Sequence, residues 1–128
     1  MAHVVLVGRI FFSLLFLFAL PGHFTANEIA YAATKGLPFA TVLVPVSGII
    51  MFVGALSILL GYKARYGAWL LVLFLVPVTL VMHRFWGLPD PATAQSQQIH
   101  FMKNLSILGA ALLIAYFGSG PLSLDRGK

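Results

Sequence analysis

Four long apolar stretches occupy most of this 128-residue chain. They run from about Val4 to Phe24, from Phe39 to Leu60, from Gly67 to Trp86 and from Ile99 to Phe117. The first contains a single Lys or Arg, Arg9, and the second contains no charged residue. A helix of about 20 apolar residues covers a hydrocarbon core of roughly 30 Å. Each stretch therefore predicts one membrane-spanning helix.

The composition excludes most classes of soluble protein. Hydrophobic residues make up 60% of the chain and charged residues 9%, against roughly 25% charged in an average soluble domain. The chain has no cysteine, which excludes disulfides, thiolate nucleophiles and thiolate-bound zinc or iron–sulfur clusters. Its net charge of +5 is scattered and forms no basic stripe with interleaved aromatics, so we expect no nucleic-acid partner.

The sequence predicts an all-α, polytopic membrane protein: a four-transmembrane-helix bundle forming one domain over residues 1–128. Residues 61–66 form a tight turn, residues 87–98 a polar loop, and residues 25–36 a short helix lying in the membrane interface. The alternative for the first stretch is a secretory signal, with Arg9 as its basic residue and residues 10–20 as its apolar core. The apolar residues before Arg9 favour a true span, and cleavage would leave three helices.

Basic residues near the helix ends predict the orientation in the membrane. An even number of spans puts both termini on one side. A cytoplasmic N-terminus places five basic residues inside and three outside, which favours cytoplasmic termini. The inner set is Arg9, Lys63, Arg65, Arg126 and Lys128, and the outer set is Lys35, Arg84 and Lys103.

Small residues and prolines indicate how the spans pack. Ala111, Ala115 and Ser119 are four residues apart and predict a close helix–helix contact, within one bundle or between two copies of the chain. Two similar phrases, LVPVS and LVPVT, place Pro45 and Pro77 inside the second and third spans. We expect these prolines to bend their helices, and the sharper alternative is a substrate site at broken helices.

One polar cluster is expected at the outer end of the bundle. The topology brings together the end of the first span, the end of the third and the start of the fourth. The residues concerned are His23, Glu28, His83, Arg84, His100, Lys103 and Asn104. His100, Lys103 and Asn104 are one helical turn apart and share a face.

Three readings of this cluster remain open: a pocket for an anionic or quinone-type headgroup, a row of side chains anchored at the membrane boundary, and a metal or haem site. No metal-ligand motif supports the third reading, so we assign no metal ligands and disfavour haem.

Arg9 is the one basic residue expected well inside a span, where an unpaired charge is costly. The carboxylate available on the same side is Asp125. We therefore predict that Arg9 and Asp125 pair or share a polar network that docks the LSLD segment under the bundle. Simple extension of Arg9 to the membrane boundary is the alternative.

Several short phrases, in this order and spacing, resemble the DoxX family over nearly the whole chain. They are Gly8-Arg9, LLG at 59–61 followed by Arg65, HRFW at 83–86, FMKNL at 101–105 with Gly109, and GSGPLSLD at 118–125.

The resemblance implies a four-helix inner-membrane protein, with relatives that include a subunit of a thiosulfate:quinone oxidoreductase. It implies an accessory subunit of a quinone-associated redox complex, with redox protein partners and no catalysis of its own. Arg9, Lys103, Asn104 and Asp125 match recurring family positions. His23 stands where members often have lysine, and Met51 where many have glutamate, which indicates a less charged membrane interior.

Two other functions compete with the redox reading. The prolines and the outer cluster favour a transporter of a small molecule or lipid, although no charged residue is expected at the midplane. A structural assembly factor without a ligand is the third.

Overall fold

The computed structural model describes residues 1–125, which form helices and no strands. The elements are α1 (Ala2–Ala19), the 3-10 helix η1 (Leu20–Phe24), α2 (Ala26–Thr34), α3 (Ala40–Leu60), α4 (Ala64–Met82) and α5 (Pro91–Phe117). Arg126 and Lys128, which the charge count assigns to the inner side, lie outside the described residues. The predicted all-α fold class is confirmed.

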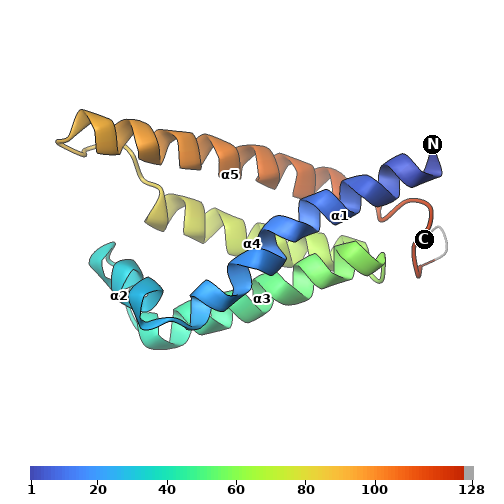
Figure 1. The fold of residues 1–128 in the computed structure, drawn as a ribbon, viewed down its shortest axis with the longest axis horizontal. Coiled ribbons are helices and arrows are strands. Elements are labelled where there is room, and N and C mark those ends of the chain that lie inside the picture. Colours follow the sequence, from blue (N-terminus) through green and yellow to red (C-terminus); the bar gives the residue numbers. More distant parts are fainter. Residues whose placement is uncertain (126–128) are drawn as a thin grey trace.

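Four segments are long and apolar enough to cross a membrane: α1 with η1, α3, α4 and α5. Figure 1 shows the start of α1 and the segment after α5 at the same end of the bundle, with α2 at the opposite end. This end-to-end arrangement is the one that four successive spans require. We call the end that carries α2 the α2 end.

Three predicted boundaries are wrong. Helix α4 begins at Ala64, inside the expected turn of residues 61–66, and ends at Met82 and not near Trp86. Helix α5 begins at Pro91, inside the expected polar loop of residues 87–98. Asp90 caps α5, because its side chain accepts hydrogen bonds from the backbone N–H and the hydroxyl of Thr93, at 3.3 and 2.6 Å. Proline is well suited to the first helical turn, where its missing N–H is not needed.

Helix α2 is the predicted short helix between the first two spans. It begins at the N-cap Thr25, whose hydroxyl accepts a hydrogen bond from the backbone N–H of Glu28 at 3.3 Å. Ala32 of α2 is buried against Ala40 and Val44 of α3 in a small apolar cluster. This packing fixes α2 across one end of the bundle.

The helices pack in the order α1, α3, α4, α5. Glycines set the closest approach, between α3 and α4. A Cβ atom added to Gly54 would lie 2.7 Å from the carbonyl oxygen of Gly67, and one added to Gly67 would lie 2.5 Å from the hydroxyl of Ser57. Helices in lipid associate through such close contacts. Ala111 and Ala115 of α5 are buried, as the small-residue pattern predicts.

Arg9 and residues 118–125 are joined at the end opposite α2. Arg9 is only 4% exposed and donates a hydrogen bond to the carbonyl oxygen of Leu122. The carboxylate of Asp125 accepts a hydrogen bond from the backbone N–H of Lys63 at 2.7 Å. The two side chains therefore dock the same segment under the bundle through different partners, and no ion pair joins them among residues 1–125. A direct Arg9–Asp125 interaction stays a prediction.

Candidate functional site

A cavity of about 330 Å³ lies between α1, α4 and α5 at the α2 end, and we call it the α1–α5 cavity. Five of the seven predicted cluster residues line it, together with Tyr31. The polar lining residues are His23, Glu28, Tyr31, His83, Lys103 and Asn104. The remaining wall is apolar and includes Phe16, Met51 and Leu75. The four-span topology therefore brings these five residues together.

Asn104 is the most deeply placed polar residue of this cavity. Only 6% of its surface is exposed, and it lies among apolar side chains such as Phe16 and Ile107. Among residues 1–125, the fully buried side-chain polar atoms without a hydrogen-bond partner belong to Arg9, Ser13 and Ser119, and the amide atoms of Asn104 are not among them. The Asn104 amide borders the cavity, where it can both donate and accept a hydrogen bond.

The other two cluster residues lie outside the cavity. Arg84 and His100 are exposed. The ring of His100 stacks on that of His83, with centroids 5.2 Å apart and planes 28° apart. His100 therefore contacts a residue of the site, His83, without lining the cavity itself.

A chain of hydrogen bonds closes one side of the cavity. His83 Nδ1 lies 3.0 Å from Gln97 Oε1, and Gln97 Nε2 donates to the Tyr31 hydroxyl at 3.2 Å. This chain joins the end of α4, the first part of α5 and α2. Sequence analysis missed Gln97 and Tyr31. The spacing of Gln97, seven residues before Asn104 and on the same face of a helix, is the signal that could have found Gln97.

His83 lies just beyond the end of α4, in a positively charged setting. Burial lowers its pKa below the ordinary value of 6.5. The hydrogen bond with Gln97 opposes this shift, whereas the positive charges of His100, Lys103 and Lys35 add to it. His83 is therefore held in the neutral form at neutral pH.

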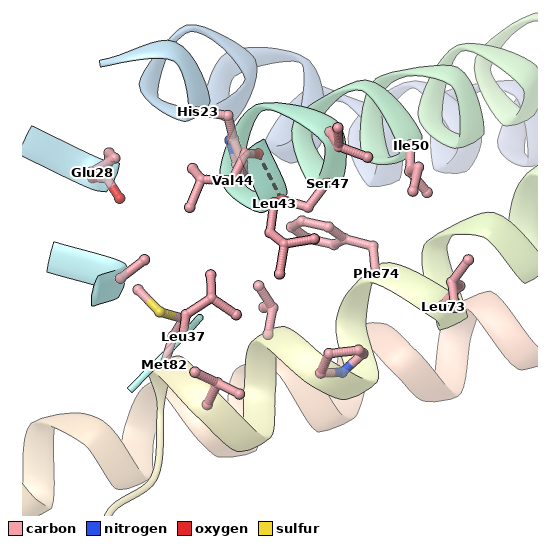
Figure 2. A pocket seen from close by; sticks show the side chains of 15 residues that line it. His23, Glu28, Leu37, Leu43, Val44, Ser47, Ile50, Leu73, Phe74 and Met82 are labelled. Carbon is pink, nitrogen blue, oxygen red and sulfur yellow. Dashed lines mark hydrogen bonds between the residues drawn. The ribbon is translucent and has the colours of Figure 1, made fainter. Parts of the chain in front are cut away.

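A second cavity, of about 310 Å³, lies between α3 and α4, and we call it the α3–α4 cavity. Figure 2 shows it, with His23 and Glu28 at its edge and Leu43, Phe74 and Met82 around the space. The two cavities share part of their lining: His23, Glu28, Phe74, Val78 and Met82. The two cavities are therefore adjacent, and these shared residues form a common wall.

Gly48 allows His23 to form part of this wall. A Cβ atom added to Gly48 would lie 2.6 Å from the Cβ of His23. The His23 ring packs on Phe74, with centroids 5.7 Å apart. Its Nδ1 lies 3.0 Å from the carbonyl oxygen of Ala19, which can only accept a hydrogen bond. Nδ1 therefore carries the proton, which leaves Nε2 as an acceptor in the neutral ring.

The lining of the α1–α5 cavity has the composition of a small-molecule pocket. Among residues 1–125, no three His, Cys, Asp or Glu side chains lie close enough together to hold a metal ion. A cavity of about 300 Å³ or more, mostly apolar with a few convergent polar groups, is typical of a small-molecule site. Figure 1 places this end of the bundle at the opposite end from the start of α1.

Comparison with known proteins decides the family. The model of the SURF4 family matches residues 2–128. The chain belongs to the SURF4 family. No solved structure matches it.

Three relatives illustrate the range of the SURF4 family. Inner membrane protein YphA of Escherichia coli is 30% identical over 125 residues, covering 96% of this chain and 89% of that protein. Inner membrane protein YqjF of the same organism is 32% identical over 124 residues, covering 95% and 89%. The ER-derived vesicles protein ERV29 of Saccharomyces cerevisiae is 28% identical over 80 residues, covering 62% of this chain and 26% of that protein.

Membership of the SURF4 family corrects the resemblance to DoxX, which is wrong. The interpretation as an accessory subunit of a redox complex, or as an oxidoreductase subunit, depended on that resemblance and is also wrong. The phrases that carried the resemblance are short. Each of them alone is too short to distinguish one family of membrane proteins from another. The membrane assignment itself stands: this is a multi-pass membrane protein.

Proposed function

We propose that this protein binds an amphiphilic small molecule or lipid in the α1–α5 cavity and transports it or presents it within the membrane. The observation that carries the proposal is Asn104, a residue only 6% exposed whose amide lies in the wall of a mostly apolar cavity. A headgroup oxygen or N–H can form a hydrogen bond with that amide. Lys103 lines the same cavity and supplies positive charge for an anionic group.

The packing order supports entry from the bilayer. Helices α1 and α5 occupy the two ends of the order, and each packs mainly on an inner neighbour, α3 or α4. The cavity between α1 and α5 therefore lies where the bundle is least tightly closed. An amphiphile can enter there with its apolar part still in lipid, which avoids the cost of moving apolar surface through water.

Orientation and location are part of the proposal. Two relatives, YphA and YqjF, are named as inner membrane proteins, which supports the same location for this chain. The excess of basic residues at the end opposite α2 supports cytoplasmic termini. The α1–α5 cavity then faces the outer leaflet.

A quinone is a specific candidate for the ligand. Its headgroup carbonyls can accept hydrogen bonds from Asn104 and Lys103, and its apolar tail suits the cavity wall. Binding of this kind does not require the chain to belong to a redox complex.

Ligand binding to the purified protein tests the proposal. We expect a dihexanoyl phospholipid or a short-chain quinone to raise the midpoint of thermal unfolding of the protein in detergent, because a ligand that binds only the folded state stabilises it. Asn104→Leu removes the amide at nearly constant volume and should abolish this shift. The free variant should remain folded, because leucine and asparagine fill nearly the same volume.

Ser106→Leu is the matched control, since Ser106 is an exposed residue of the same helix outside the cavity lining. It should keep the ligand-induced shift. Equal shifts in the original protein and in Asn104→Leu, for every ligand that binds, would overturn the proposed function.

A further inference from the structure

The α3–α4 cavity lies on the α2 side of the glycine contact between these helices, and that contact is near the turn that joins them. Gly54 and Gly67 hold α3 and α4 together at the level where Gly54 meets the backbone of Gly67. Towards the α2 end, larger side chains such as Ile50 and Leu73 replace glycine on the facing surfaces. The helices must separate there, and the space between them is the cavity.

The cavity lining is almost entirely apolar. Ser47 is its one hydroxyl-bearing residue, and the Ser47 hydroxyl donates to the carbonyl oxygen of Val44 at 2.7 Å, as the dashed line in Figure 2 shows. That hydroxyl is therefore already satisfied. Leu43 and Leu73 lie at the mouth with 40% and 58% of their surfaces exposed, on helices that cross the membrane. The mouth thus opens to lipid hydrocarbon and not to water.

The polar groups of this cavity gather at the wall shared with the α1–α5 cavity. His23 and Glu28 line both cavities. Glu28 accepts no hydrogen bond and forms no ion pair within residues 1–125. Phe74 and His23 line both cavities, and both side chains are partly exposed. An acyl chain in the α3–α4 cavity would therefore lie next to a headgroup in the α1–α5 cavity.

We infer that the α3–α4 cavity holds one acyl chain of a phospholipid whose headgroup lies in the α1–α5 cavity, with the chain passing over the edge of the His23–Phe74 wall. The inference rests on the proposed function and adds the ligand class. The apolar lining takes the chain. Lys103 and Asn104 take the phosphate, and Glu28 suits a headgroup ammonium on the same lipid.

Two valines of α3 provide a matched test. Val46 lines the α3–α4 cavity and is 43% exposed, and Val53 lies two turns further along, outside the lining, at 48% exposed. Val46→Trp fills the cavity, whereas Val53→Trp adds the same bulk on the lipid-facing surface elsewhere. Val46→Phe is the second filling variant, in case tryptophan disrupts the fold. The probes are phosphatidylethanolamines with six-carbon and sixteen-carbon chains, and affinity is measured by displacement of a spin-labelled lipid.

The sixteen-carbon lipid should bind the original protein and Val53→Trp at least tenfold more tightly than the six-carbon lipid. We expect Val46→Trp and Val46→Phe to lose this difference in affinity, while their affinity for the six-carbon lipid is unchanged. An undiminished gain in both folded filling variants would overturn the inference and leave the headgroup site intact. Failure of the proposed function looks different, because Asn104→Leu would then bind both lipids as the original protein does.

Discussion

Replacing Gly48 by alanine tests whether the contact between α3 and η1 builds the site. The added Cβ would lie 2.6 Å from His23 Cβ and 2.9 Å from His23 Cγ. These atoms are next to the backbone, so a rotamer change cannot remove the clash and η1 must move away from α3. Overpacking of this kind costs about 1–3 kcal/mol. Alanine has a higher helix propensity than glycine, which offsets this loss of stability by up to about 1 kcal/mol. We expect a net loss of about 1 kcal/mol.

Gly109→Ala is the control that isolates the steric part. Gly109 lies within α5, and a Cβ atom there would meet nothing within 4 Å. This variant should be more stable than the original protein by up to about 1 kcal/mol. Because the propensity gain is common to both variants, the difference between them, about 1–3 kcal/mol, measures the clash with His23.

The assay is reversible unfolding in mixed micelles, followed by circular dichroism, together with phospholipid binding. Gly48→Ala should bind lipid more weakly, since displacement of His23 deforms the wall of both cavities. Gly109→Ala should bind normally. Equal stabilisation of both variants would show that η1 does not lie against Gly48, and the geometry of the site given above would be wrong.

Three further predictions follow from the packing and the charges. Gly54→Ala should destabilise the protein by about 1–2 kcal/mol in the same unfolding assay, because its Cβ would meet the Gly67 carbonyl oxygen at 2.7 Å; a stable variant would mean that α3 and α4 are further apart. Arg9→Gln and Asp125→Asn should have non-additive effects on the free energy of unfolding, because both side chains hold the segment 118–125, and strict additivity would rule out a shared network. The pKa of His83 is lowered in the folded protein, so its contribution to stability is fully present above pH 6.5 and is lost as the pH falls from 6.5 through the folded pKa. His83→Gln should therefore make the free energy of unfolding depend less steeply on pH below 6.5. An unchanged slope would contradict the lowered pKa of His83.

The spans and the location of the polar cluster could be predicted because both depend on long-range patterns that lipid imposes. A run such as residues 39–60 can be satisfied only by a helix across the bilayer. Once four spans are fixed, His23, His83 and Asn104 must lie at the same end. The family could not be recognised in this way, because short phrases such as those around Gly61 do not distinguish one family of membrane proteins from another.

The start of α5 could have been predicted, but not from hydropathy. An apolar run indicates which residues lie in lipid. A helix can begin earlier, in polar sequence, if its N-terminus is capped. Asp90 followed by Pro91 is such a start signal, and Thr93 completes it. The apolar run starts near Ile99, and the helix therefore begins about two turns earlier.

The cavities could not be predicted because they depend on which atoms meet across helices. The wall between them exists because Gly48 lets His23 approach α3. Nothing in the sequence near Gly48 distinguishes it from Gly8, beside which a Cβ atom would meet nothing. The pairing of Gln97 with Tyr31 joins residues 66 positions apart, a distance at which one sequence gives no contact signal.

The segment after α5 has a consequence for how the protein is made. The carbonyl oxygens of Leu60 and Gly61 at the end of α3 accept hydrogen bonds from the backbone N–H groups of Leu124 and Asp125, at 3.1 and 2.9 Å. The turn between α3 and α4 thus emerges from the ribosome some 60 residues before its partners. During synthesis the carbonyl groups of that turn are solvated by water at the membrane surface, and they gain these hydrogen bonds only after residues 124 and 125 have been made.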